Sequence, residues 1–251
     1  MIEAGTRTPE FVVIGVGGLG CPALLGLLAG GVERVTLVDD DVVESSNLQR
    51  QVLFSTADVG RPKVSVAAWA LRERCVGEPP TITCRRERID PARADAWVAE
   101  LPRDAIVLEC TDDPALEFAI HDACMARARP LVVGGVLGFR GQVMAIDPRR
   151  SDRACFRCLF EAPPPRELAP ACASVGVLGA VAGLLGQWMA LLALRLAGPA
   201  RELDDDPADG TLIAVDMLRG ALRRLSPPPR PDCPACSIRA ASLRNLDDRP
   251  A

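Results

Sequence analysis

The sequence has a single histidine and no excess of basic residues, and both shortages narrow the functions open to it. His121 alone cannot supply a catalytic triad or a metal site, and because it falls within a predicted helix we interpret it as structural. The 29 basic residues are balanced by 33 acidic ones, which gives a net charge of -4. A protein without a basic excess has no general attraction to nucleic acid, so any phosphate-binding site must be local.

Residues 1–10 also lack the charged and then apolar layout of a signal peptide. Ten cysteines in a chain without an export signal indicate reduced thiols, which serve metal binding or chemistry before disulfides. We therefore predict a cytoplasmic protein. Its 251 residues suffice for one substantial core and contain neither an internal repeat nor a dividing linker, so a single domain over 1–251 is expected.

Long apolar runs are rare, and the exception covers residues 173–194, where Ser174 and Gln187 are the only polar side chains. The run is long enough to cross a bilayer, and a membrane helix is the alternative interpretation. Because the basic flanks are thin, we predict instead a buried helix of an α/β core, with a glycine face that lets backbones approach closely. That face consists of Gly176, Gly179, Gly183 and Gly186.

Runs of β-branched and apolar residues alternate with longer helix-like stretches elsewhere, which is typical of a largely parallel sheet covered by helices. We expect strands at 11–16, 34–38, 81–84, 105–108, 131–133 and 142–146. We expect helices at 19–29, 64–75, 91–100 and 114–128. Residues 211–215 and 221–225 are predicted to form an antiparallel pair at the C-terminal end. The predicted fold class is therefore α/β and Rossmann-like, with helices on both faces of the sheet.

A glycine-rich segment connects the first predicted strand to its helix. It contains Gly15, Gly17, Gly18 and Gly20. Glycine permits a tight turn and close backbone approach, and the helix N-terminus offers free N–H groups to phosphate. Asp39 ends the second strand, where a carboxylate can hold a ribose hydroxyl. This pattern indicates a nucleotide, and it fits NAD as well as ATP; packing of helix on strand without a ligand is the other alternative.

The residues that follow carry a more specific pattern. They are Asp39-Asp40-Asp41-Val42-Val43-Glu44-Ser45-Ser46-Asn47-Leu48-Gln49-Arg50-Gln51, then Gly60-Arg61-Pro62-Lys63 and Cys110-Thr111-Asp112-Asp113. In this combination the chain resembles the ubiquitin-activating-enzyme-like family, of the ThiF/MoeB/HesA type that serves molybdopterin and thiamin sulfur carriers. The resemblance extends from Phe11 to about Cys236.

The resemblance implies an ATP site with two fixed cations. Adenylyl transfer builds negative charge on the α-phosphate and on the departing pyrophosphate, which Arg50 and Lys63 would stabilise. The resemblance places Asp39 on the ribose and Asn47 with Arg50 on the phosphates. Asp112 follows a buried strand at the ligand-binding edge, and as an anion beside phosphates it is assigned to Mg²⁺. Further candidate nucleotide-binding residues in these motifs are Asp41, Ser46, Leu48, Gln49 and Asp113.

Four of the cysteines form two pairs with metal-ligand spacing. These are Cys155-x-x-Cys158 and Cys233-x-x-Cys236. The separation between the pairs exceeds that of a compact zinc ribbon, so two unrelated thiol pairs are the alternative. The family carries a four-cysteine clamp at this place, which implies a closed structural Zn²⁺ site. The remaining cysteines apart from Cys172 are expected to be buried small hydrophobic residues, namely Cys21, Cys75, Cys84, Cys110 and Cys124.

Cys172 lies between the proline-rich segment 162–170 and the apolar helix. Members of the ThiF type carry a cysteine there that forms a covalent link to the carrier, and a helix N-terminus would lower the pKa of this thiol. Many relatives work without such a cysteine, so the alternative is that Cys172 takes no part.

Two positions depart from the family pattern. Relatives usually carry an N-terminal helix whose arginine reaches the partner subunit's ATP site, whereas only ten residues precede Phe11 and Arg7 lies too near the strand. Either that function is met elsewhere, or the ATP site is weaker, or the start codon was misassigned. Asp113 stands where relatives commonly have asparagine. Both departures bear on catalysis and neither bears on the fold.

The resemblance implies ATP-dependent adenylation of the C-terminal glycine carboxylate of a small ubiquitin-like sulfur carrier ending in Gly-Gly. The acyl-AMP would then accept sulfur from an external donor, and the protein would act as a homodimer without nucleic acid or membrane partners. Three alternatives stay open: an NAD-dependent oxidoreductase, a non-catalytic carrier-binding scaffold, and a family member that adenylates a peptide or a tRNA base.

Overall fold

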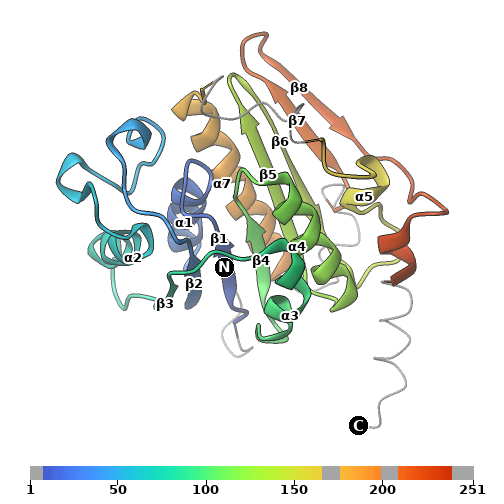
Figure 1. Ribbon diagram of the computed structural model, residues 1–251, viewed down its shortest axis with the longest axis horizontal. Helices are drawn as coiled ribbons and strands as arrows, with labels where there is room; N and C mark the ends of the chain where they lie inside the picture. Colours follow the sequence, from blue (N-terminus) through green and yellow to red (C-terminus); the bar gives the residue numbers. More distant parts are fainter. Residues whose placement is uncertain (1–7, 166–175, 199–208, 239–251) are drawn as a thin grey trace.

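The computed structural model describes residues 8–165, 176–198 and 209–238, and within them the strands form one sheet (Figure 1). The strand order is β3-β2-β1-β4-β5-β6-β7-β8, with neighbours parallel from β3 to β5 and antiparallel from β5 to β8. The strands are β1 (Phe11–Ile14), β2 (Arg34–Val38), β3 (Thr81–Arg85), β4 (Ile106–Glu109), β5 (Leu131–Leu137), β6 (Arg140–Ile146), β7 (Leu212–Asp216) and β8 (Ala221–Leu225). The parallel core with antiparallel C-terminal strands confirms the predicted fold class.

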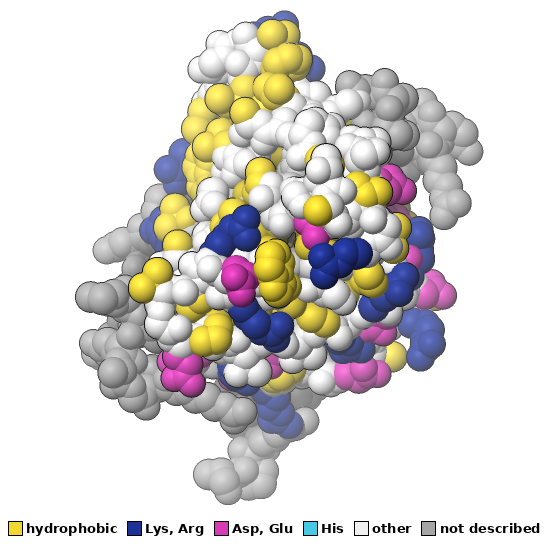
Figure 2. All heavy atoms as spheres, turned by 90° about the vertical axis from the view of Figure 1, so that its left-hand side faces the viewer, with side chains coloured by type: hydrophobic (Ala, Val, Ile, Leu, Met, Phe, Trp, Pro, Cys, Tyr) yellow, Lys and Arg dark blue, Asp and Glu magenta, His cyan; other side chains and the backbone are white. Residues whose placement is uncertain are grey.

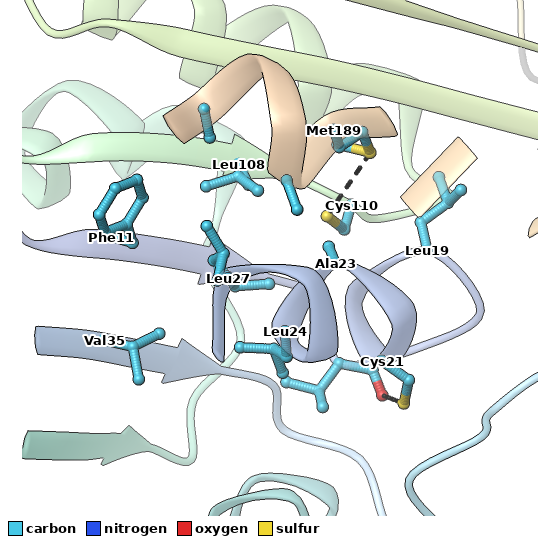
Figure 3. Packing of buried hydrophobic residues seen from close by; sticks show 14 of the residues in the cluster. Phe11, Leu19, Cys21, Ala23, Leu24, Leu27, Val35, Leu108, Cys110 and Met189 are labelled. Atoms are coloured by element: carbon cyan, nitrogen blue, oxygen red, sulfur yellow. Dashed lines mark hydrogen bonds between the residues drawn. The ribbon is translucent and has the colours of Figure 1, made fainter. Parts of the chain in front are cut away.

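Helices cover both faces of the sheet, as the alternating pattern predicted. They are α1 (Gly20–Ala29), α2 (Lys63–Arg74), α3 (Ala94–Ala99), α4 (Pro114–Ala126), α5 (Phe156–Leu159) and α7 (Gly179–Leu196). One buried cluster joins α1, α2 and α7 to the sheet, and the other joins α3, α4 and α5 to the opposite face. Figure 3 shows the first cluster, in which Leu24 and Leu27 of α1 lie near Phe11 and Val35 of the strands.

The apolar helix α7 packs against α1 and against β5 and β6, so it belongs to the core. By length and composition it could cross a membrane, but half of its residues are buried inside the fold, as in the core helix of an α/β protein. Two of its side chains contact the end of β4 and helix α1. Met189 lies 4.0 Å from the Cys110 thiol at the end of β4 (Figure 3), and Gln187 donates a hydrogen bond to the Pro22 carbonyl of α1.

The start of α7 differs from the prediction. Gly176 has a φ of +79° and Val177 forms a β-bridge to Gly138, so the described helix begins only at Gly179. Residues 173–175 lie outside the described residues. Of the predicted glycine face, Gly186 allows the close backbone approach, to the start of α1, whereas a Cβ atom on Gly183 would meet nothing within 4 Å.

Two smaller corrections concern the helix predicted over 91–100 and two of the cysteines. The helix predicted over 91–100 is divided, because Asp90 caps a 3₁₀ turn at Pro91–Arg93 before α3 begins. Cys84 was expected to be buried, but it lies on the edge strand β3 and is exposed, while Cys75 lies past the end of α2 and is half-buried. Cys21, Cys110 and Cys124 are buried as predicted.

The surface agrees with the balanced charge of the sequence. On the side that carries α2, which faces the viewer in Figure 2, Lys and Arg side chains are interspersed with Asp and Glu and with exposed hydrophobic groups. Trp69 of α2 is one of these exposed groups, with 54% of its surface accessible. This face carries no broad basic field among its described residues, so electrostatic recognition has to be sought in the cleft described next.

Candidate nucleotide-binding site

The glycine loop turns sharply between the last residue of β1 and the first turn of α1. Gly15 has a φ of +88°, and a Cβ atom there would lie 2.9 Å from the Cys110 carbonyl oxygen at the end of β4. At Gly20, the first residue of α1, a Cβ atom would lie 2.0 Å from the carbonyl oxygen of Gly15. The turn itself therefore requires these two glycines, because no side chain fits at either position.

Gly17 and Gly18 have a different role, because they face the open cleft. A Cβ atom on Gly17 would stand 3.7 Å from the Gln51 amide nitrogen, and one on Gly18 would stand 3.3 Å from Arg50 Cδ. No side chain caps the start of α1. Within the first turn, the N–H of Cys21 donates to the Gly17 carbonyl at 3.0 Å and Pro22 has no N–H. The N–H groups of the loop before Cys21 and the positive end of the helix dipole are what this turn offers to an anion.

The cleft over this loop has a volume of about 450 Å³ and lies at the carboxyl ends of β1, β2 and β4. It brings together most of the residues predicted for nucleotide binding. Those that line it are Gly15, Gly17, Gly18, Asp39, Asp41, Asn47, Arg50, Lys63, Asp112 and Asp113. The other four predicted residues do not line it, namely Gly20, Ser46, Leu48 and Gln49.

Asp39 is held at the end of β2 by two backbone donors. Its carboxylate oxygens accept hydrogen bonds from the N–H of Val16 at 2.7 Å and from the N–H of Asp41 at 2.9 Å. Burial raises the pKa of Asp39 above its ordinary value, although Lys63 and the two N–H groups act in the opposite direction. The side chain is thus oriented toward the cleft before any ligand binds, which suits contact with ribose hydroxyls.

Lys63 begins α2 directly after Pro62, and only 7% of its side chain is exposed. Its ammonium nitrogen lies 2.8 Å from a carboxylate oxygen of Asp41, whose side chain is exposed. A buried lysine is stable only with a charged partner. This lysine therefore belongs to the cleft and not to the solvated surface, and Asp41 serves as its counterion.

Arg50 is positioned by its own turn. One guanidinium nitrogen, Nη2, donates to Asn47 Oδ1 at 2.5 Å. The other, Nη1, donates to the Gln49 side-chain oxygen at 2.8 Å in the amide orientation that satisfies the hydrogen bonds of Gln49. Gln49 therefore supports Arg50 from behind the cleft. Ser46 bonds instead to Glu44, and Leu48 packs against the core cluster around α1. These three predicted ligands hold the loop in shape.

The turn between β4 and α4 supplies the acidic side of the cleft. Asp112 is exposed within it, whereas Asp113 accepts hydrogen bonds from the N–H groups of Ala115 and Leu116 as the N-cap of α4. Aspartate at this position thus has a structural explanation, because it caps the helix as well as asparagine would. Asp112 has no such role in the described structure, which leaves its carboxylate for a cation.

Sequence reasoning missed three residues of this region. Gln51 lines the cleft, is 3% exposed, and has a side-chain oxygen with no hydrogen-bond partner among the described residues. Glu117 of α4 also lines the cleft, and burial raises its pKa to about 7. Glu109 is fully buried behind it, where burial and then the charge of Glu117 raise its pKa to about 8. Gln51 directly follows Arg50, which was the one sequence signal available.

The two cysteine pairs are far apart in the sequence, but the fold brings them together beside α4 and α5. Their sulfur atoms lie 3.6 to 3.8 Å apart in the recorded pairs, and all four fall within 4.8 Å of one another. Tetrahedral Zn²⁺ with bonds of about 2.3 Å to sulfur sets neighbouring sulfurs about 3.8 Å apart. The cluster thus fits zinc, and its residues are Cys155, Cys158, Cys233 and Cys236. Cys172 lies outside the described residues, as do residues 1–7 with Arg7.

Comparison with known proteins agrees with this geometry. The model of the ThiF family matches residues 6–235. "Adenylyltransferase and sulfurtransferase MOCS3" of Sus scrofa is 40% identical over 241 residues, covering 92% of this chain and 49% of that protein. "Sulfur carrier protein adenylyltransferase" of Thermus thermophilus is 37% identical over 234 residues, covering 92% of this chain and 83% of that protein. The chain thus spans about half the length of the MOCS3 relatives it matches.

Solved structures show the same fold at lower identity. A crystal structure of E. coli MccB with ATP superposes with a TM-score of 0.75 at 20% identity, covering 91% of this chain and 67% of that one. MccB in complex with N-formylated MccA gives a TM-score of 0.76 at 19% identity, with the same coverage. These structures share the fold; the match of the family model over residues 6–235, together with the sequence relatives above, establishes that the chain belongs to the ThiF family.

Proposed function

We propose that the protein adenylates the C-terminal glycine carboxylate of a small ubiquitin-like sulfur carrier with ATP. The observation that carries this proposal is the cleft, which joins a phosphate-binding loop to two positioned cations, Arg50 and Lys63. An oxidoreductase that transfers hydride has no need of two such charges beside the phosphates. The names of the relatives, which include a sulfur carrier protein adenylyltransferase, support the same substrate class.

In the reaction, a carboxylate oxygen of the carrier attacks the α-phosphorus and the bond to pyrophosphate breaks. Asp39 holds the ribose, and the N–H groups after Gly17 and Gly18 bind phosphate oxygens. Arg50 and Lys63 stabilise the charge that develops on the α-phosphate and on the leaving group. Magnesium, with Asp112 as its protein ligand, supplies further neutralisation of the phosphates when bound. The products are acyl-AMP and pyrophosphate.

Later sulfur chemistry requires groups beyond the described cleft. We propose that an external donor delivers sulfur to the acyl-AMP, with displacement of AMP. In an alternative route, the Cys172 thiol attacks the acyl carbonyl, releases AMP and leaves a thioester to the carrier, from which the sulfur of the donor then displaces the Cys172 thiolate. Substituting Cys172 should leave pyrophosphate exchange intact, because adenylation precedes any cysteine chemistry, while a carrier adduct visible by intact mass should disappear.

Three properties accompany the proposed activity. The donor set of the cysteine cluster supports Zn²⁺ in a closed structural site, since four thiolates leave no position for water. The apolar residues left exposed on α7, Leu184 and Leu191, support burial in a homodimer. The reduced state expected of the clustered thiols suits the cytoplasm.

Pyrophosphate exchange into ATP tests the proposed function directly. Exchange should require Mg²⁺ and a protein that ends in Gly-Gly, and either Arg50→Ala or Lys63→Ala should lower its rate by about 10²–10³. Arg72→Ala, on the exposed side of α2, provides a charge-matched control and should keep the wild-type rate. Wild-type exchange rates in both cleft variants would exclude the mechanism. Binding of NAD in place of ATP would favour the oxidoreductase.

A further inference from the structure

The segment that leads into the second cysteine pair is nearly devoid of backbone donors. Its residues are Pro227-Pro228-Pro229-Arg230-Pro231, and because proline has no N–H, Arg230 carries the single amide hydrogen of this stretch. That N–H donates a hydrogen bond to the Cys158 Sγ atom at 3.3 Å. The one backbone donor of the segment is therefore directed at a sulfur of the cysteine cluster.

The side chain of Arg230 reaches the same cysteine pair by a second route. Its guanidinium forms an ion pair with Glu161, which follows Cys158 by three residues. The Glu161 carbonyl accepts a hydrogen bond at 2.6 Å from Arg157, between the first two cysteines. The Glu161 side chain is 79% exposed, and an ion pair with so exposed a partner contributes little. The N–H bond to sulfur is thus the contact that can act on a bound metal.

A hydrogen bond to a metal-bound thiolate has two physical effects. Four thiolates around one Zn²⁺ leave an excess of negative charge, and an N–H donor disperses part of it and orients the sulfur toward the metal. The donor also withdraws electron density from the sulfur, so the thiolate becomes a weaker nucleophile. Cys158 is only half-buried, which makes the second effect accessible to small reagents.

We propose that Arg230 is a positioning residue of the metal centre, whose N–H holds the Cys158 thiolate on the bound zinc and lowers its reactivity. The inference rests on the zinc site given with the proposed function, and it adds a residue that is not itself a ligand. It also assigns a role to the proline-rich segment, which can donate this one backbone hydrogen bond and no other.

Two substitutions at the same position separate the N–H from the side chain. Arg230→Pro removes both, whereas Arg230→Ala removes only the guanidinium. The residue already precedes Pro231, which restricts it to an extended backbone that proline also adopts. The rate at which the chelator pyridylazoresorcinol removes zinc from each intact protein is measured. It should be about 10–100-fold faster in Arg230→Pro than in wild type, and close to wild type in Arg230→Ala.

The second measurement is the reactivity of the Cys158 sulfur, which a purely structural role of Arg230 would not change. Zinc-loaded protein is treated with iodoacetamide in the presence of excess zinc, and alkylation is mapped by peptide mass spectrometry. Cys158 should react faster in Arg230→Pro than in Arg230→Ala, whose rate should match wild type.

The third measurement uses wild-type protein alone, so it does not depend on the folding of a variant. With an NMR-active isotope of cadmium in place of zinc, the Arg230 amide proton should show scalar coupling to the metal through the hydrogen bond and the sulfur.

Equal chelation and alkylation rates in the two variants would overturn the inference. If Arg230→Pro does not fold, the coupling decides, and its absence from wild type would overturn the inference. Wild-type protein without bound zinc would exclude both the zinc site and the role of Arg230. Pyrophosphate exchange would still test adenylation separately, because none of these measurements involves the nucleotide cleft.

Discussion

Burial favours the neutral forms of Glu117 at the cleft and of Glu109 behind it, and their pKa values are raised to about 7 and about 8. The side chain of Glu109 is enclosed at the end of β4, where one oxygen accepts from Thr111 and the other has no partner among the described residues. Glu117 faces the cleft one helical turn after the N-cap of α4. Both groups therefore exchange protons near neutral pH, unlike carboxyls in water.

The first prediction concerns stability and pH at Glu109. Its pKa is about 8 in the folded protein, against an ordinary value of 4.5, so the folded state binds the extra proton between these limits. The protonated Glu109 carboxyl contributes fully to the free energy of unfolding below pH 4.5, and this contribution is lost as the pH rises toward 8. Glu109→Gln, which mimics the neutral acid, should flatten this decline in urea midpoints between pH 5 and 8. An unchanged slope, with Glu73→Gln as control on α2, would contradict the burial argument.

The second prediction concerns ligand binding and pH at Glu117. As the pH rises through its pKa of about 7, this side chain becomes an anion on the wall of the cleft that receives the triphosphate. ATP affinity should therefore decrease from pH 6 to pH 8, since like charges in a partly buried site repel each other. Glu117→Gln should bind ATP with less dependence on pH, measured by calorimetry. A steeper dependence in the variant would overturn the assignment.

At the scale of elements, helix α7 gives a paired test of close packing. At Gly186 a Cβ atom would lie 2.4 Å from the Leu19 carbonyl oxygen, so helices α1 and α7 approach each other through this glycine. At Gly183, one turn earlier, a Cβ atom would meet nothing within 4 Å. Gly186→Ala should destabilise the fold by about 1–3 kcal/mol through overpacking. Gly183→Ala should stabilise it by about 0.5–1 kcal/mol through helix propensity.

Denaturant midpoints measured at constant m-value decide between the two outcomes. If both variants shift the midpoint in the same direction, the contact between α1 and α7 does not depend on Gly186.

Elements were predictable from sequence wherever the pattern is local. The glycine loop and Asp39 at the end of β2 follow from residue type and spacing, and the structure places them together. The break before α7 was not predictable, because the apolar run continues through Gly176 and only the bridge from Val177 to Gly138 interrupts the helix. Tertiary pairing overrode local propensity at that point.

The same distinction explains the site. Arg50 and Lys63 were identified by their motif, but the roles of Gln49, Ser46 and Leu48 depend on which way each side chain of a short turn points. Side-chain direction in a turn is set by contacts with other segments, here the core around α1 and the Glu44 carboxylate. The raised pKa of Glu117 depends on burial, and that of Glu109 depends on burial and then on the charge of Glu117 across the β4–α4 turn, neither of which spacing alone reveals.

At the scale of the whole molecule, the cysteine cluster ties the segment after β6 to the segment after β8. Arg157, between the first two cysteines, makes two hydrogen bonds to Asp122 of α4 at 2.6 and 2.7 Å, so the cluster is also joined to the helix that starts at the cleft. We predict one zinc per chain. Cys233→Ala or chelation should lower the melting temperature, because metal binding is coupled to folding.

Cys84→Ala, on the exposed edge strand, is the control and should retain both metal and melting temperature. Metal analysis and thermal scans measure the two quantities separately. Protein that contains disulfides in place of metal would refute the zinc site and the reduced state together.

The burial of Lys63 affects whether the protein reacts with the acyl-adenylate that we propose it forms. Acyl-adenylates acylate free amines, and an enzyme that makes them exposes its own surface to that side reaction. Lys63 is the only lysine in the sequence, and its ammonium group is enclosed and paired with Asp41. All other fixed cations are arginines, whose guanidinium groups stay protonated and do not act as nucleophiles. Self-acylation should therefore be nearly absent, and Arg88→Lys at the wall of the cleft should introduce it, seen as an amide-linked carrier adduct by mass spectrometry.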